Sequence, residues 1–414
     1  MSPILGIVAS QISGHLSPPR FLASITTSAG NQTGRGILVY NGDIYLAGFD
    51  AQGGGLFQKI TTTPTISVSK YLSNSFSLGN GIIANDGAGN FYLANTTGAQ
   101  AALLVKINAA GAIQAQKEYG GLYATIGLVW DATNSVGYLP IYPSTGGHGA
   151  IIKVDSSLAI SFQKEFSSSA PDDNYLYAVA LDSSGAPHAF GYARGGTENL
   201  IAKLTTGGSL TWQINPQGPT MIAGAVDSSG NVYGLGFDGP SLFKFNSAGA
   251  QQWVRRITHV NQVRSAENCL ILADDGFLYY VGFYTTGSTP ANGGCIIKYN
   301  TSGTIQWQRT LLSATDNIKL QGIAVTGSTM YVTGTIATNG GDVFLASLPT
   351  DGSLTGTYSL GGTNIVYAAG AFTEANPGYT TSAQTTTMSN ASFSATTPTY
   401  TAATSTPTLT KVTV

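Results

Sequence analysis

The chain contains few charged residues. Asp, Glu, Lys and Arg make up 9% of its 414 residues, against about a quarter in an average globular protein. The formal net charge of −2 gives no electrostatic footprint for nucleic acid or an anionic membrane, so neither is expected as a partner. The surface must instead consist of Ser, Thr, Asn, Gln and Gly. Such a composition favours a long-lived extracellular or particle-bound protein.

Cysteine is nearly absent, and long apolar runs are missing. Cys269 and Cys295 fall on expected strands that a third strand separates, which puts them about 9–10 Å apart. That distance excludes a disulfide, so we expect two free, buried thiols. No apolar run reaches membrane-spanning length. The start of the chain lacks a basic region, and its apolar run from Pro3 to Ala9 is short for a signal peptide, so export by that route is not expected.

Residues for catalysis are also scarce. The four histidines lie in different parts of the chain, which disfavours a metal cluster or a Ser-His-Asp arrangement, and we expect them on the surface or in loops: His15, His148, His188 and His259. The motifs H-E-x-x-H and G-x-S-x-G and a phosphate-binding glycine loop with lysine do not occur. We therefore expect no enzyme activity, no catalytic residue, no metal and no cofactor.

The chain does contain one hairpin motif that is repeated many times. "DSSGNVYGLGF" runs from Asp227 to Phe237 and combines an Asp turn with alternating apolar residues, which predicts a β-hairpin. Further copies begin at Asn41, Asp86, Asp131, Asp182, Asp274 and Thr326. Each copy has an apolar run before it and two further strand-like runs after it. Four strands in a unit of 41 to 54 residues match a propeller blade.

The seven units predict an all-β, seven-bladed propeller in which "RFLASITT", from Arg20 to Thr27, helps to close a ring of four-stranded sheets. The alternative is an eighth blade made from residues 364–410, with the same N-terminal strand at its outside. The pattern "D-x-x-G-N-x-Y…K…G-x-x-x-W" resembles the SBBP-type β-propeller repeat over roughly Gly36 to Gly361. This resemblance implies a fold and hardly any chemistry, because propellers serve as enzymes, lectins and scaffolds.

Two sets of charged residues recur once per unit. Five carboxylates follow the innermost strand, and a ring of them could bind a ligand or Ca²⁺, although a turn role accounts for all five: Asp86, Asp131, Asp182, Asp227 and Asp274. Six lysines lie on the third strand, where a cationic ring is the alternative to stems that cover apolar surface: Lys59, Lys106, Lys153, Lys203, Lys244 and Lys298. In both sets the structural role is favoured.

Tryptophan recurs at one place of the outermost strand. Trp212, Trp253 and Trp307 therefore predict packing between blades. Trp130 ends an inner strand instead and is expected at the mouth of the central channel.

The two ends of the chain differ from the repeats. "SPILGIVASQISGHL" resembles an N-terminal sequence carried by structural proteins of tailed bacteriophages, which implies an attachment arm with apolar anchors: Ile4, Leu5, Ile7, Val8, Ile12 and Leu16. A strand folded on the propeller's own surface is the alternative. Residues 375–410 contain no charged residue and are rich in Thr, which favours ordered β structure in an assembly over disorder.

Three segments follow: an arm (residues 1–19), a propeller (20–362) and a Thr/Ser-rich β segment for assembly or closure (363–414). The hypothesis for function is a homo-oligomeric virion protein of a tailed phage, serving in the tail, a fibre or capsid decoration. It would bind other virion proteins through its arm and touch glycans on the host surface. The alternative is a secreted or periplasmic bacterial propeller that binds or hydrolyses a polysaccharide.

Overall fold

The structure is a computed structural model. It describes residues 19–26, 32–50, 54–72, 82–97, 101–120, 123–124, 127–143, 147–167, 174–193, 198–237, 239–286, 292–337, 341–383, 387–391 and 393–414. All six apolar anchors expected in the N-terminal arm, and His15, lie outside the described residues. Every regular element in the described part is a β-strand, so no helix there is long and apolar enough to cross a membrane.

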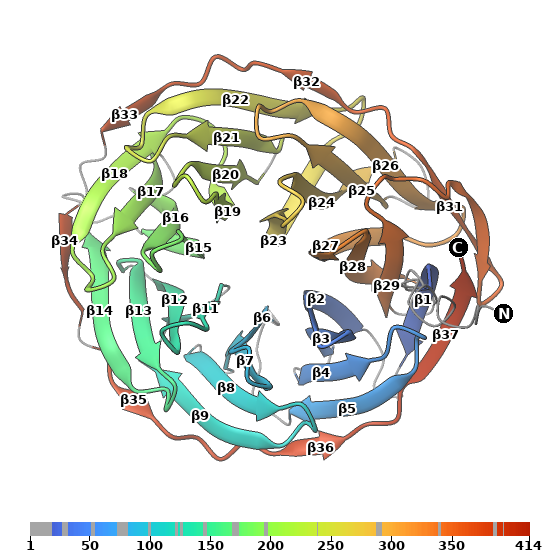
Figure 1. The fold of residues 1–414 in the computed structure, drawn as a ribbon, viewed down its shortest axis with the longest axis horizontal. Coiled ribbons are helices and arrows are strands. Elements are labelled where there is room, and N and C mark those ends of the chain that lie inside the picture. The colour runs from blue at the N-terminus through green and yellow to red at the C-terminus, as the bar shows by residue number, and fades with distance from the viewer. Residues whose placement is uncertain are drawn as a thin grey trace, which may run out of the picture.

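The strands form seven antiparallel sheets around a central axis, and we number these blades in chain order (Figure 1). The first three blades contain β2 (Gln32–Tyr40), β3 (Asp43–Asp50), β4 (Gly55–Ile60) and β5 (Ile66–Leu72); β6 (Ile82–Asn85), β7 (Asn90–Thr96), β8 (Ala102–Asn108) and β9 (Ile113–Tyr119); and β10 (Tyr123–Ala124), β11 (Val129–Asp131), β12 (Val136–Pro143), β13 (Ala150–Asp155) and β14 (Ile160–Ser167). In the third blade the innermost strand is divided into β10 and β11.

The other four blades continue the pattern. They contain β15 (Tyr175–Leu181), β16 (Pro187–Ala193), β17 (Glu198–Leu204) and β18 (Leu210–Pro216); β19 (Met221–Val226), β20 (Val232–Gly236), β21 (Ser241–Phe245) and β22 (Gln251–Thr258); β23 (Val263–Leu272), β24 (Leu278–Thr285), β25 (Asn292–Tyr299) and β26 (Ile305–Ser313); and β27 (Ile318–Thr326), β28 (Thr329–Ile336), β29 (Asp342–Pro349) and the N-terminal β1 (Phe21–Thr26).

The seventh blade closes the ring with strands from opposite ends of the chain. Six blades are built from consecutive stretches of sequence, whereas the seventh takes β1 as its fourth strand. Phe21 pairs with Ser347, and Ile25 pairs with Val343 on β29. The strand expected within Arg20–Thr27 is observed as β1, Phe21–Thr26, and completes this sheet, so the alternative of an eighth blade is wrong.

The Thr-rich C-terminal segment encircles the propeller. The chain turns back after β29 and contributes β30 (Gly356–Leu360), β31 (Thr363–Ala369), β32 (Thr373–Ala375), β33 (Thr381–Ala383), β34 (Thr387–Asn390), β35 (Ala395–Thr396), β36 (Ala402–Thr404) and β37 (Thr408–Thr413). The strands β31 to β37, which we call the belt, pair in turn with the sixth, fifth, fourth, third, second, first and seventh blades. Figure 1 shows the belt as the red outer ring.

The belt corrects one expectation, because the sheets have five or six strands and not four. The C-terminal segment, for which assembly or closure was expected, forms ordered strands that pair with its own propeller. The reason lies in the outer strand of each blade, whose free edge presents unpaired backbone groups. An extended, Thr-rich chain with only two charged residues, Glu374 and Lys411, can pair with such an edge at every blade.

Side chains fix the belt to the outer strands. Phe372 donates its backbone N–H to Oε1 of Gln308 (2.7 Å), and Phe393 donates to Oε1 of Gln163 (2.9 Å). Aromatic residues of the belt also pack against the buried clusters between blades, as Phe372 and Tyr379 do. The belt therefore pairs with the outer strands of the blades and also contacts the apolar core between them.

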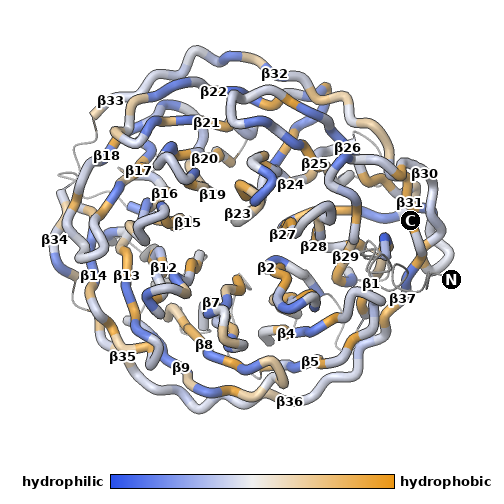
Figure 2. The backbone as a smooth tube through the Cα atoms, viewed as in Figure 1, coloured by the Kyte–Doolittle hydropathy of each residue, from blue (hydrophilic) through white to orange (hydrophobic). Residues whose placement is uncertain are grey.

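The core lies between the blades. Nearly every residue of the second and third strands is buried, as in β7 and β8, because both faces of these strands are covered by neighbouring blades. Figure 2 shows hydrophobic residues distributed around the whole ring. Burial between blades explains why one blade cannot stand alone, since each apolar face needs its neighbour.

Candidate functional site

The ring has two faces with different connections. The face that we call the turn face carries the turns between the first and second strands and between the third and fourth strands of each blade. The opposite face, which we call the loop face, carries the connections between the second and third strands and from each blade to the next. The expected aspartate ring lies on the turn face.

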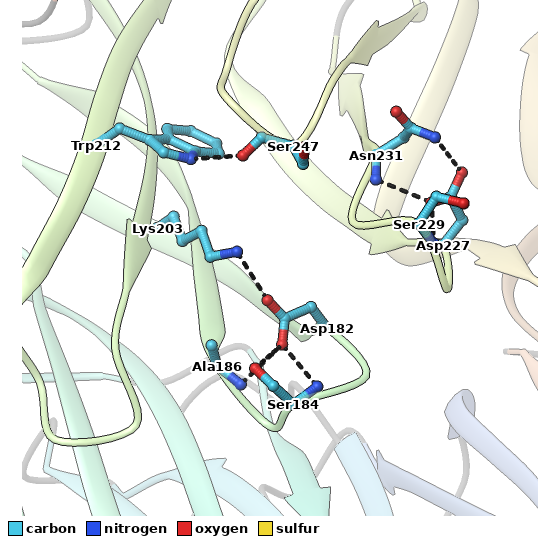
Figure 3. A network of polar contacts seen from close by, with 9 residues as sticks. All are labelled: Asp182, Ser184, Ala186, Lys203, Trp212, Asp227, Ser229, Asn231 and Ser247. Atoms are coloured by element: carbon cyan, nitrogen blue, oxygen red, sulfur yellow. Dashed lines mark hydrogen bonds and ion pairs between the residues drawn. The ribbon is translucent and has the colours of Figure 1, made fainter.

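The turn aspartates accept hydrogen bonds from their own turns. Asp182 accepts from the backbone N–H groups of Ser184 (2.9 Å) and Ala186 (3.1 Å) and binds Nζ of Lys203 at 2.9 Å, as Figure 3 shows. Burial alone would raise the pKa of Asp182, but the bonds from Ser184, Lys203 and the turn amides outweigh it and lower the pKa to about 2. Asp227 is bound in the same way by Ser229 and Asn231.

Two more members follow this pattern, and one does not. Asp86 accepts from the backbone of Asn90 (3.0 Å), and Asp131 accepts from that of Asn134 (3.0 Å). In the sixth blade Asp275 takes the turn position, with Nζ of Lys298 at 3.0 Å and the hydroxyl of Tyr279 at 2.6 Å. Asp274, which we expected there, is exposed.

These contacts describe a structural ring. The carboxylate oxygens bind turn amides, lysines or tyrosines of their own blade. Among the residues that the structure describes, no group of three His, Cys, Asp or Glu side chains is placed to hold a metal ion.

The third-strand lysines join neighbouring blades. Lys153 lies over the ring of Tyr138, 5.5 Å from its centroid, and donates to the carbonyl of Thr206 in the next blade (2.9 Å). Lys244 does the same with Tyr233 (5.3 Å) and the carbonyl of Thr301 (3.1 Å). The lysine stems therefore cover aromatic surface while the ammonium groups reach across the blade junction.

His188 interrupts this row. The third-strand lysines, with Ser347 in the seventh blade, each pair with one residue of the second strand. This second-strand residue is Tyr in six blades and His188, which pairs with Lys203, in the fourth. Contrary to the expectation of a surface or loop residue, His188 is fully buried. Its ring nitrogens make no well-formed hydrogen bond to a described residue. Burial, and to a smaller extent the nearby Lys203, lowers its pKa to about 4, against weaker opposing effects of Asp182 and the Ala186 backbone.

The outer tryptophans pack between blades as predicted. Trp212 donates Nε1–H to the carbonyl of Ser247 in the fifth blade (3.0 Å) (Figure 3), and Trp307 donates to the carbonyl of Thr350 (3.0 Å). Trp130 was expected at the channel mouth, and this is wrong. It stacks on Tyr92 of the second blade with 3.5 Å between ring centroids, because the blade junction offers a flat aromatic partner.

Both cysteines are buried and neither forms a disulfide, which confirms that prediction. Cys269 lies on β23, and Cys295 lies on β25. Burial raises the pKa of Cys295 to about 12. The thiols therefore belong to the core of the sixth blade.

A narrow cavity of about 160 Å³ lies where the seven innermost strands meet. Every blade contributes to its wall, mostly with apolar residues such as Ile37, Val179 and Ile323. Arg35 is the one charged residue in this described lining, which contains no carboxylate and no imidazole. The cavity therefore offers no acid–base pair for catalysis.

Bulges shape the loop-face end of this cavity. Extra residues stand at equivalent positions of the innermost strands, including Arg35, Tyr177 and Gln321. The opposing second-strand residue is then Gly, as at Gly48 and Gly191. A Cβ atom on either glycine would lie 1.9 Å from a carbonyl oxygen of the bulged strand. Such bulges turn side chains away from the regular pleat.

Cations and tyrosines gather at this end. Arg264, Lys319 and Arg35 lie on the innermost strands of the sixth, seventh and first blades and are partly exposed. The guanidinium of Arg35 lies 5.5 Å from the Phe49 ring centroid, and Nζ of Lys319 lies 5.2 Å from that of Phe283.

On the fourth blade, across the ring, three partly exposed tyrosines form a cluster. Tyr175 and Tyr192 have ring centroids 4.9 Å apart, and Tyr177 lies 5.9 Å from Tyr192. Sequence reasoning missed the cations and the tyrosines. A signal was present, because these residues lie close to the glycines of the second strands that mark the bulges.

Comparison with known proteins supports the fold. No protein-family model and no curated protein sequence matches the chain. The crystal structure of virginiamycin B lyase from Staphylococcus aureus is similar, with 13% identity and a TM-score of 0.52, covering 79% of this chain and 99% of the lyase. The Dos1 propeller (11% identity, TM-score 0.46, 74% and 76% covered) and a luciferin-regenerating enzyme (10%, 0.40, 79% and 95%) are more distant. At such identities the likeness shows a β-propeller fold alone.

Proposed function

We propose that this protein is a non-enzymatic structural component of a tailed-phage virion, held by its N-terminal segment and displaying a propeller that adheres to host-surface glycans. The observation that carries the proposal is the pairing of the first described strand with the last one at the rim of the seventh blade. Phe21 on β1 pairs with Thr413 on β37, and Val414 donates its N–H to the carbonyl of Arg20 (3.0 Å). The segment before residue 19 therefore joins the ring at its rim, away from the central axis.

Two further observations support this role. The belt holds every blade at its outer edge, which suits a protein that must stay folded on a particle outside the cell. The described cavity lining lacks carboxylates, whereas hydrolysis of a polysaccharide generally needs a pair of them. Both favour display and binding over the alternative of a polysaccharide hydrolase.

The test replaces two anchors of the arm. In Ile4→Asp with Ile7→Asp, charged side chains cannot fill apolar pockets on a partner, so co-sedimentation with particles should be lost while thermal unfolding stays that of the parent protein. Ile25→Val, a change within β1, is the matched control and should incorporate normally. Normal incorporation of the double variant would contradict the attachment role.

A further inference from the structure

The loop-face end of the axial channel combines two chemistries. One side carries three cations on consecutive blades, Arg264, Lys319 and Arg35, and the other side carries the tyrosine cluster of the fourth blade. In a chain with 18 Lys and Arg among 414 residues, three at one end of three neighbouring innermost strands form a local concentration of positive charge. The innermost strands carry two carboxylates: Asp131 lies at the turn-face end of β11, and Glu267 lies on β23, three residues after Arg264, with a side chain that the structure does not describe.

The cations are held in place by their surroundings. Arg35 and Lys319 lie against aromatic rings, and Arg264 donates to Oε1 of Gln262 (3.3 Å). Such contacts reduce the rotamer entropy that a long side chain loses when it binds an anion. The nearby carboxylate of Asp342 lies on β29, the third strand and thus farther from the axis, and accepts from the hydroxyl of Thr26 (2.8 Å).

The tyrosines supply a surface for a different part of a ligand. Their rings are partly exposed and spaced between 4.9 and 6.3 Å apart. Tyrosine presents a flat apolar face and a hydroxyl at the same time. This combination suits a pyranose ring, which has one C–H face and hydroxyl groups around its edge.

We propose that the loop-face end of the channel binds an acidic carbohydrate, with sugar carboxylates on the Arg264–Lys319–Arg35 side and a sugar ring on the Tyr175–Tyr177–Tyr192 side. The inference rests on the proposed adhesive function and names its ligand class. The cavity of about 160 Å³ is smaller than an ordinary ligand pocket. The carbohydrate therefore lies across the mouth, as an oligosaccharide, and does not pass through the ring.

Binding is measured by calorimetry with oligogalacturonate and with its methyl ester, which keeps the sugar rings and removes the charge. We expect the acid to bind and the ester to bind at least tenfold more weakly, and we expect added salt to weaken the acid alone. Arg35→Gln with Lys319→Gln should weaken acid binding by about tenfold or more. Tyr177→Ser should weaken it severalfold. Lys117→Gln, at the outer edge of the second blade, is the matched control.

Equal binding of acid and ester, or full binding by the double Gln variant, would overturn the inference. Unchanged melting temperatures show that each variant is folded. The outcome is independent of particle incorporation: a protein that co-sediments with particles but binds no oligogalacturonate disproves the acidic ligand and leaves the virion role standing. A protein that binds the acid but incorporates normally with Ile4→Asp and Ile7→Asp disproves the attachment role of the arm and leaves the acidic ligand standing.

Discussion

Burial of His188 should make the stability of the protein fall as the pH is lowered from 6.5 to 4. The imidazole is fully buried, and burial, aided by Lys203, lowers its pKa from 6.5 to about 4. Above pH 6.5 the imidazole is neutral in the folded and unfolded chain, so its contribution is fully present. As the pH falls from 6.5 towards 4, the unfolded chain binds a proton that the folded protein does not, and stability is lost.

The size of the effect follows from the two pKa values. A difference of about 2.5 corresponds to about 3 kcal/mol, because one pKa unit is worth about 1.4 kcal/mol. A domain of ordinary stability has about 5–15 kcal/mol in total, so this loss is large enough to measure. Asp182 titrates near pH 2, below the window, and does not obscure it.

The assay compares urea unfolding of the parent protein and His188→Tyr at pH 7.5, 6, 5 and 4.5. Tyrosine occupies the same position in the other six blades, and Asp182 can accept its hydroxyl as Asp227 accepts that of Tyr233 (3.1 Å). We expect the parent protein to lose about 2–3 kcal/mol more than the variant over this range. His148→Gln, at a partly exposed site, is the control for loss of a histidine elsewhere. Equal pH dependence in His188→Tyr would refute the argument.

Three further predictions follow from the turns, the thiols and the belt. Asp275→Asn should cost about 1–3 kcal/mol in urea unfolding, because it weakens the charged bonds to the lysine and tyrosine of its blade, whereas Asp274→Asn, which removes the same charge at an exposed site, should cost less than about 0.5 kcal/mol. Cys295, whose pKa is raised to about 12, should resist thiol reagents until the protein unfolds, and rapid labelling of the native protein would contradict its burial. Truncation after Glu374 removes β33 to β37 and should lower the melting temperature substantially in differential scanning calorimetry; an unchanged melting temperature would show that the belt does not stabilise the ring.

The hairpins of the blades could be predicted because their signals are local. An Asp at a turn bonds to amides two and four residues ahead, as in Asp182 with Ser184 and Ala186, and such pairs stand next to one another in the sequence. The packing of the outer tryptophans could also be predicted, because a residue at the same position of successive units contacts the next blade in the same way. Local periodicity therefore predicts the four inner strands of the blades.

The belt could not be predicted because its partners are far away in the sequence. Gln116 donates to the carbonyl of Tyr400 across 284 residues (3.3 Å), and no local turn or alternation announces such a pair. One signal was present: Phe372 and Tyr379, and again Phe393 and Tyr400, are seven residues apart, which is the step from one blade to the next along the belt.

Substitutions inside a repeated pattern were the second source of error. His188 stands in the column that is otherwise Tyr, and composition alone placed it on the surface. Its burial follows from the neighbouring blade, which covers that column in every unit, whatever residue occupies it. The cations of the loop face were missed for a related reason, because the positions of Arg35 and Lys319 hold other residue types in other blades, and only the ring brings the two cations to one end of the channel.

The closure of the ring also separates attachment from binding. A load that enters through residue 20 passes into β1, which is held by β29 on one edge and by β37 on the other. Two antiparallel ladders therefore share the load, and the belt passes it on to the outer edges of the other blades. The innermost strands, which carry Arg35, Lys319 and Tyr177, lie three strands away from β1 or on other blades. A propeller anchored at this rim can thus be pulled without distorting the end of the channel where a ligand would bind.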